Sequence, residues 1–419
     1  MPFWWPGHEA RLPVLSGVLW VVVLLQMGVG GVAFATENED AITRFLRRHW
    51  SRPLPPQGPA PTEFAPVEAD LDPNACAQCH GTQHADWQQS LHRRGWGPGL
   101  MGQLLDMPAL ARDDHQTCLR CHAPLAEQAD SLVAFLEQAG KREAPAWDGL
   151  TCAGCHVRGH QRFGPPPLFP PGAAMEHLPH RGWSVESAFE DARFCATCHQ
   201  FAEDDPALNG KLLENTFEEW RQSRYARERK PCQSCHMPGR RHLWRGIHDP
   251  DMVRSGLELR VEPVATERDG AALRLVLQSV GIGHFFPTYV TPRVVVAAWQ
   301  KDQAGRILEE SRQEVVIARD VSLDLTEERA DTRIPPGGTA TLDYRRPRHP
   351  RGMTLAWEVR VEPDHFYRLF YEAALRAGSF PRGGELIRAA LRRAAESSYT
   401  LYAGEQPLAR SPDQAPVTP

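Results

Sequence analysis

The 419-residue sequence has no cysteine outside one short repeated motif, only four lysines and no strongly basic stretch. The lysines are Lys141, Lys211, Lys230 and Lys301, and they stand beside 43 arginines. A formal net charge of −5 without a basic cluster argues against nucleic-acid binding. A hydrophobic content of 42% excludes a disordered or fibrous chain, and the length predicts two domains.

The ten cysteines all lie in a Cys-x-x-Cys-His motif that occurs five times. The copies are Cys76, Cys79 and His80; Cys118, Cys121 and His122; Cys152, Cys155 and His156; Cys195, Cys198 and His199; Cys232, Cys235 and His236. Two thiols at this spacing bind the vinyl groups of one haem, and the adjacent histidine becomes its proximal iron ligand. A zinc site or a disulfide framework would not require a histidine after every second cysteine. The motifs therefore predict five covalently attached c-type haems.

The arginine excess has two explanations. The planar guanidinium suits bidentate pairing with haem propionates. Genomic base composition accounts for the excess equally well.

An apolar run from residue 12 to residue 35 follows one clear positive charge, Arg11, and ends in the small-x-small sequence AFA. These features are typical of an export signal. The run also approaches the length of a membrane-spanning helix. We expect residues 1–35 to be a signal peptide that is cleaved, in preference to a retained membrane anchor, and the rest to be periplasmic or exported.

The remaining chain divides by composition into four parts. Residues 36–71 begin with a short helix and continue as a proline-rich linker. Residues 72–250 contain the five motifs, at uneven steps of 42, 34, 43 and 37 residues that exclude a solenoid repeat. We expect a mostly helical, loop-rich domain packed around its haems, with helices in 131–143 and 215–230.

The last two parts have different periodicities. Residues 251–364 show six alternating segments separated by turn sequences, which predicts a β-sandwich. Residues 365–419 contain two amphipathic helices and a polar tail that we expect to fray. The fold class is therefore an α+β multidomain protein.

A second axial ligand on each iron distinguishes an electron carrier from a catalyst with an open iron. Eleven histidines beyond the linker lie outside the motifs, enough to cap five irons. They are His84, His92, His115, His160, His177, His180, His242, His248, His284, His349 and His365.

Several segments between about residues 72 and 290 carry a specific resemblance: DWQQSLH, CLRCHAPLAEQ, FCATCHQF, EEWRQSRYA before CQSCHMP, RRHLWRGIHD and GHFFPT. The chain resembles multihaem c-type cytochromes related to cytochrome c554, the tetrahaem electron acceptor of hydroxylamine oxidoreductase. The resemblance implies that His92, in the pattern W-x-x-S-x-H, caps a haem. It nominates His180, His242, His248 and His284 as further distal ligands, with His84, His115, His160 and His177 in reserve. The alternative for each is an ordinary histidine that binds no metal.

The chain departs from its relatives in ways that bear on function. It has five motifs where the tetrahaem proteins have four, and no motif has the lysine of the active haem of pentahaem nitrite reductases. The tyrosine cross-link of hydroxylamine oxidoreductase has no obvious counterpart. We expect an electron relay with mostly bis-histidine haems, not an enzyme. The alternatives are an oxidoreductase with one five-coordinate haem that acts on a small nitrogen or sulfur compound, and a docking subunit of a membrane redox complex.

The sequence GIGHFFPTYVTP interrupts the strand pattern of the expected sandwich. His284 within it either fills a tight turn or serves as the distal ligand of a haem that belongs to the preceding domain. We favour the second interpretation, in which Phe285 and Phe286 wall the macrocycle. An iron would then connect the two domains.

Overall fold

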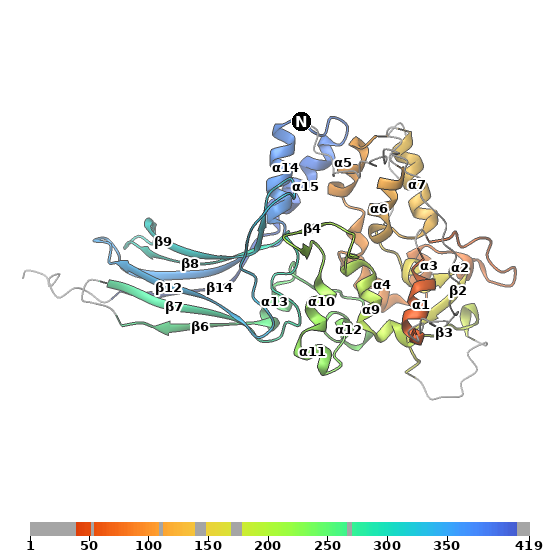
Figure 1. Ribbon diagram of the computed structural model, residues 1–419, viewed down its shortest axis with the longest axis horizontal. Coiled ribbons are helices and arrows are strands. Elements are labelled where there is room, and N and C mark those ends of the chain that lie inside the picture. The colour runs from red at the N-terminus through yellow and green to blue at the C-terminus, as the bar shows by residue number, and fades with distance from the viewer. Residues whose placement is uncertain are drawn as a thin grey trace, which may run out of the picture.

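The structure is a computed structural model that describes residues 39–51, 54–108, 112–138, 148–168, 178–265 and 270–408. The expected export segment and His177 lie outside these residues. Within the described ranges, helices that combine enough length and apolar character to cross a membrane are absent. Helices occupy one end of the molecule and long strands the other (Figure 1).

Residues 39–256 form short helices joined by loops, small strands and single 3-10 turns. The helices are α1 (Ala41–His49), α2 (Pro66–Ala69), α3 (Pro73–Ala77), α4 (Gly81–Gln89), α5 (Pro98–Asp106), α6 (Arg112–His122), α7 (Ala126–Glu137), α8 (Cys152–His156), α9 (Ala192–His199), α10 (Thr216–Arg221), α11 (Arg224–Arg227), α12 (Cys232–His236) and α13 (Pro250–Gly256). The small strands are β1 (Val157–Arg158), β2 (Gln161–Gly164), β3 (Ser184–Val185), β4 (Ala207–Leu208) and β5 (Lys211–Leu212). We call residues 39–250 the haem region.

Four of the five motifs form the end of a helix whose last residue is the motif histidine, in α6, α8, α9 and α12. A helical turn brings residues three and four apart to one face, so both cysteines and the histidine lie together. The expected helix over 215–230 is split into α10 and α11. The Ser223 side chain accepts a hydrogen bond from the Tyr225 backbone and so starts a new helix there.

Two antiparallel sheets follow, and we call them the sandwich. Their strands are β6 (Leu257–Pro263), β7 (Gly270–Ser279), β8 (Arg293–Lys301), β9 (Ile307–Ile317), β12 (Thr339–Pro347), β13 (Thr354–Glu362) and β14 (Tyr399–Pro407). The sheet orders are β12-β7-β6 and β14-β13-β8-β9. A hairpin of β10 (Arg319–Val321) and β11 (Glu328–Asp331) extends from the second sheet. All six segments with alternating sequence are confirmed as strands.

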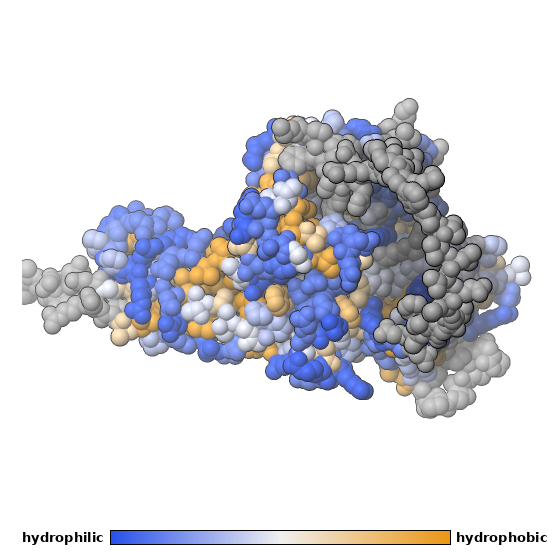
Figure 2. Space-filling model, viewed as in Figure 1, coloured by the Kyte–Doolittle hydropathy of each residue, from blue (hydrophilic) through white to orange (hydrophobic). Residues whose placement is uncertain are grey.

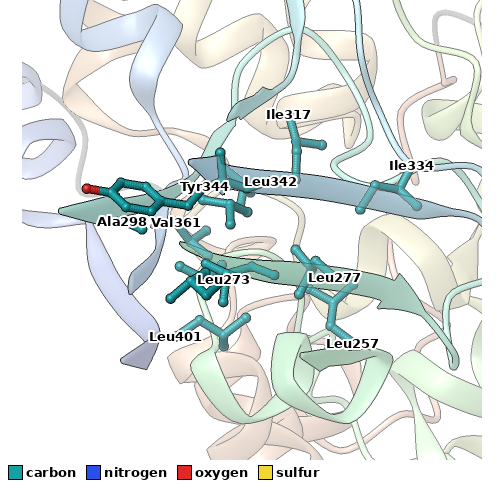
Figure 3. Close-up of a cluster of buried hydrophobic side chains, with 14 of the residues drawn as sticks. Leu257, Leu273, Leu277, Ala298, Ile317, Ile334, Leu342, Tyr344, Val361 and Leu401 are labelled. Atoms are coloured by element: carbon teal, nitrogen blue, oxygen red, sulfur yellow. The ribbon is translucent and has the colours of Figure 1, made fainter. Parts of the chain in front are cut away.

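The sandwich core lies between the two sheets (Figure 3). Leu273, Leu275 and Leu277 alternate along β7, and each is fully buried. They meet Val296 and Val359 of the opposite sheet in one cluster. Hydrophilic side chains dominate the outer surface in one view, apart from hydrophobic areas on and beside the sandwich (Figure 2). Alternation of apolar and polar residues therefore produced this part of the fold.

The C-terminal part differs from the expectation in one respect. Helices α14 (His365–Arg376) and α15 (Gly384–Glu396) form as expected, but residues 399–407, expected to belong to a frayed tail, form β14 and pair with β13. Leu401 of β14 is buried in the sandwich core, and this burial offsets the cost of ordering the segment. Beyond β14, residues 409–419 lie outside the described residues.

The two C-terminal helices return to the haem region and pack on α5 (Figure 1). A Cβ atom at Gly99 would lie 2.2 Å from the Tyr371 hydroxyl, and one at Gly102 would lie 2.8 Å from Ile387. Glycine at both positions of α5 therefore permits the close approach of α14 and α15. The chain thus passes three times between its two halves, because it returns to the sandwich as β14 after α15.

Residues 36–71 are expected to be a simple linker, and the described part of this segment instead packs on the haem region. Phe45, His49, Trp50 and Leu54 are all buried. His49 Nε2 lies 2.7 Å from the Cys155 carbonyl oxygen. Isolated apolar residues in the segment give it a fixed position that a purely polar tether would lack.

Candidate haem-binding site

Four motif histidines face a second histidine ring at nearly the same separation. The ring centres are 6.5 Å apart for His80 and His180, 6.2 Å for His156 and His242, 6.2 Å for His199 and His92, and 6.4 Å for His236 and His284. The interplanar angles are 27°, 34°, 48° and 16° in the same order. Four of the five histidines that the resemblance nominates are therefore brought opposite motif histidines.

This separation can be compared with the space that an iron atom needs. A metal–imidazole bond is about 2 Å long, and the ring centre lies roughly 1 Å beyond the nitrogen, so one metal shared by two imidazoles holds their centres about 6 Å apart. Direct ring stacking would bring the centres closer, and unrelated rings would have no common spacing. The residues present thus fit four haem irons.

The Nδ1 atoms of these histidines fix the direction of their rings. His180, His242 and His284 place Nδ1 within 2.8 to 3.0 Å of backbone carbonyl oxygens two or fewer residues away. His156 Nδ1 lies 2.8 Å from the carbonyl oxygen of Phe163, and His236 Nδ1 lies 2.6 Å from the carbonyl oxygen of Arg245. An Nδ1–H that donates to a carbonyl leaves Nε2 free as an iron ligand.

Charged side chains hold the loop that carries His242. Asp86 of α4 is buried and accepts hydrogen bonds from Arg241 at 2.6 and 2.7 Å and from the His242 backbone at 3.0 Å. The bonds from Arg241 lower the pKa of Asp86, in opposition to burial, and the His242 backbone lowers it further. Trp244 follows in the same loop and contacts the rings of both His92 and His242.

The second motif differs from the other four. His122 Nδ1 lies 2.8 Å from the Gly95 carbonyl oxygen, and in the part of the chain that the structure describes no ring faces it. Tyr367 of α14 lies near this motif. The Tyr367 side chain is exposed, and Cys118 of the motif lies within electrostatic range of it.

His248 is not brought to a motif histidine, although the resemblance nominates it. Its Nε2 lies 3.0 Å from a carboxylate oxygen of Asp364. Among the reserves, His160 Nε2 lies 2.9 Å from the Gly58 carbonyl oxygen, and His115 is fully buried in α6. His84 lies beside Trp87 with ring centres 5.6 Å apart.

Sequence reasoning missed His49, because it lies in the expected linker. Its ring contacts Phe189, which stacks on the ring of His156 with centres 4.9 Å apart. No motif marks His49, and only its burial identifies it.

The motifs approach one another in a definite order. The Cys76 and Cys152 thiols are within hydrogen-bonding reach, and so are those of Cys195 and Cys232. Cys155 lies within electrostatic range of Cys195. This places the first motif beside the third, the third near the fourth, and the fourth beside the fifth. The second motif approaches the fourth, because Cys121 acts electrostatically on His199.

Buried ion pairs fasten the sandwich to the haem region. Arg319 is almost fully buried, pairs with Glu328 at 2.8 Å and donates to the backbone oxygens of Lys211 and Leu212, which form β5. A second buried pair, Arg333 and Glu219, joins the sandwich to α10.

The second pair also fixes the loop that carries His284. Glu219 Oε1 lies 2.9 Å from Arg333 Nη1, and Glu219 Oε2 accepts a hydrogen bond from the backbone N–H of Phe285 at 3.1 Å. One carboxylate of the haem region thus holds both the sandwich and its histidine loop.

Comparison with known proteins supports a haem-binding role. Residues 75–157 match the family model described as cytochrome c554 and c-prime. A solved penta-heme cytochrome c552 from Thermochromatium tepidum has a similar fold, with a TM-score of 0.55 and 16% sequence identity over 82% of this chain and 100% of that chain. No curated protein sequence matches the chain. These comparisons confirm the resemblance to multihaem c-type cytochromes of the cytochrome c554 type, and they support the binding of haem c.

Proposed function

We propose that this chain, a multihaem c-type cytochrome related to cytochrome c554, is an exported pentahaem electron carrier with mostly bis-histidine haems. The observation that supports this proposal most strongly is the set of four histidine pairs with ring centres 6.2 to 6.5 Å apart. Iron with two imidazole ligands has no free position for a substrate, and it suits electron transfer.

The pairs support an assignment of ligands to four haems, which we number by their motifs. Haem 1 takes His80 and His180, haem 3 takes His156 and His242, haem 4 takes His199 and His92, and haem 5 takes His236 and His284. The haem chemistry supplies the reversible one-electron step. The chain holds the ligands, excludes water and sets the potentials through hydrogen bonds and burial.

The contacts between motifs support a continuous path for electrons. Haem 1 would lie beside haem 3, and haem 4 beside haem 5, because the Cys76 thiol lies close to that of Cys152 and the Cys195 thiol close to that of Cys232. Haems 3 and 4 would connect these two pairs of haems. The partners in this proposal are a donor protein and an acceptor protein, either free or within a membrane redox complex, with no nucleic acid.

Mass and spin state test the proposal together. The mature protein should weigh its polypeptide plus five haems, and electron paramagnetic resonance of the oxidised protein should show four low-spin haems. A mass with four haems or fewer, from a host that matures c-type cytochromes, would refute the pentahaem assignment. Two or more high-spin haems would refute the carrier with mostly bis-histidine ligation.

A second candidate function rests on His122, which faces no ring in the described residues. In this alternative, haem 2 is five-coordinate and binds a small nitrogen or sulfur compound, while the other haems supply or remove electrons. Substrate turnover, measured together with carbon monoxide binding to the reduced protein, distinguishes the two functions. The alternative requires one haem to bind carbon monoxide and one substrate to be turned over, whereas a pure carrier shows no turnover.

A further inference from the structure

His199 differs from the other motif histidines in the group that its Nδ1 atom meets. His122, His156 and His236 place Nδ1 at 2.6 to 2.8 Å from backbone carbonyl oxygens of the haem region. His199 Nδ1 instead lies 2.7 Å from the phenolic oxygen of Tyr289. Tyr289 comes from the sandwich, in the same loop as His284. The histidine of the fourth motif is therefore oriented by a side chain from the other half of the molecule.

A carboxylate lies close to this hydrogen bond. Glu214 Oε1 lies 3.5 Å from His199 Nδ1, and the Glu214 side chain also interacts with the Tyr289 hydroxyl. Thr216 lies close to the same phenol. When Nε2 of His199 binds iron, Nδ1 carries the ring proton, and this N–H donates a hydrogen bond to the phenolic oxygen of Tyr289. The phenol then directs its own proton toward Glu214 or Thr216.

The backbone conformation of Tyr289 indicates that neighbouring contacts hold the residue in place. Its φ of 63° is in the left-handed region, which is unfavourable for a bulky side chain. Such a conformation persists only where neighbouring contacts determine it. Here the adjacent Thr288 hydroxyl meets the Thr216 hydroxyl at 2.6 Å, and Phe286 pairs with Ile334 through the backbone.

We propose that Tyr289, with Glu214 behind it, is a positioning residue that lowers the reduction potential of the haem of the fourth motif. An acceptor on the Nδ1–H of an axial histidine makes the imidazole a stronger electron donor, which stabilises ferric iron. A nearby carboxylate also favours the ferric state, because its negative charge stabilises the additional positive charge of the oxidised iron. This inference rests on the proposed function, because it requires His199 to bind a haem iron.

The test is Tyr289→Phe in the full, haem-loaded protein, with each potential measured by spectroelectrochemical titration. We expect five haems by mass, an unchanged number of low-spin haems and a positive shift of one potential. Tyr344→Phe is the matched control. Tyr344 is fully buried in the sandwich, and its hydroxyl donates to the Ser311 carbonyl oxygen at 2.9 Å, far from any motif. The control removes a buried phenol hydroxyl and should leave all five potentials unchanged.

Glu214→Gln provides a second variant that retains the phenol. It should raise the same potential as Tyr289→Phe, by a smaller amount. Five haems with unchanged potentials in Tyr289→Phe, or a negative shift, would overturn the inference and leave the pentahaem carrier intact. If Tyr289→Phe fails to mature with five haems, unchanged potentials in Glu214→Gln overturn it. Fewer than five haems in the unaltered protein would refute the proposed function itself.

Discussion

The rings of His236 and His284 lie 6.4 Å apart and within 16° of parallel, although one belongs to a motif of the haem region and the other to a sandwich loop. Glu219 holds the backbone beside His284, and Arg333 pairs with Glu219. The position of His284 therefore depends on the contact between the two halves of the molecule.

His284→Ala should convert one haem from low spin to high spin, because the iron loses its sixth ligand. Loss of that shared ligand should also loosen the sandwich, seen as faster proteolysis near residues 250–256. His349→Ala is the control, since His349 Nε2 pairs with Glu310 at 2.8 Å on the sandwich and faces no motif histidine. Five unchanged potentials and spin states in His284→Ala would show that His284 is an ordinary turn residue.

His248→Ala should leave every low-spin haem unchanged, because the structure pairs His248 with Asp364 and not with a motif histidine. His180→Ala, in the same spectroscopic measurement, should produce one high-spin haem, because His180 faces His80. A new high-spin signal in His248→Ala would mean that His248 is a ligand after all.

Arg319→Ala should destabilise the protein, because it removes a buried guanidinium that pairs with Glu328 and donates to two backbone oxygens of β5. Breaking a buried ion pair from one side typically costs about 3–5 kcal/mol, and the loss should lie toward the lower end because Lys211 Nζ remains 2.6 Å from Glu328. Arg329→Ala removes an exposed pair with Asp320 and should cost less than about 1 kcal/mol. Denaturant unfolding followed by tryptophan fluorescence measures both. Equal effects of the two substitutions would contradict the proposed fastening role of Arg319.

Asp331 provides a pH-dependent contribution to stability. Burial alone would raise its pKa, but hydrogen bonds from Arg333 and Lys211 outweigh burial and hold the pKa well below its usual range. A carboxylate whose pKa is lower in the folded state stabilises the fold above its unfolded pKa of about 4, and this stability is lost as the pH falls toward the folded pKa.

Denaturant unfolding at neutral pH and near pH 3 tests this contribution. Asp331→Asn should be less stable than the unaltered protein at neutral pH, and the difference should shrink in acid. Asp320→Asn, at an exposed site, should show a small and constant difference. A difference for Asp331→Asn that grows in acid would mean that the folded state does not lower the pKa of Asp331.

Local patterns in the sequence predicted the features that depend on local chemistry. The motif cysteines and histidines are defined by the spacing that a haem requires, and the strands by alternation of apolar and polar residues. The match of residues 75–157 to the cytochrome c554 family model agrees with the resemblance found in segments such as DWQQSLH. His92 could be nominated as a ligand because it ends a W-x-x-S-x-H pattern that can be recognised in the sequence.

Features that depend on tertiary contacts could not be read in this way. No spacing shows that His180 faces His80 while His248 pairs with Asp364, because both outcomes depend on loops from distant segments. Phe45 and His49 lie four residues apart on one face of the short helix α1, and this spacing indicates a helix but not what its buried face packs against. Tyr289 was invisible as a partner of His199 because the two residues meet only after both halves of the molecule have folded.

The loop of residues 281–292 has a consequence for the order of assembly. Synthesis delivers the chain from its N-terminus, so all five motifs are made before this loop is. In the proposed assignment, haems attached at the fourth and fifth motifs therefore wait for Tyr289 and His284, and neither reaches its final electronic state until the sandwich has formed. A truncated or misfolded sandwich would leave a fully haem-loaded precursor with one open iron. The haems of the fourth and fifth motifs would then take their final spin states and potentials only in molecules whose sandwich is correctly folded.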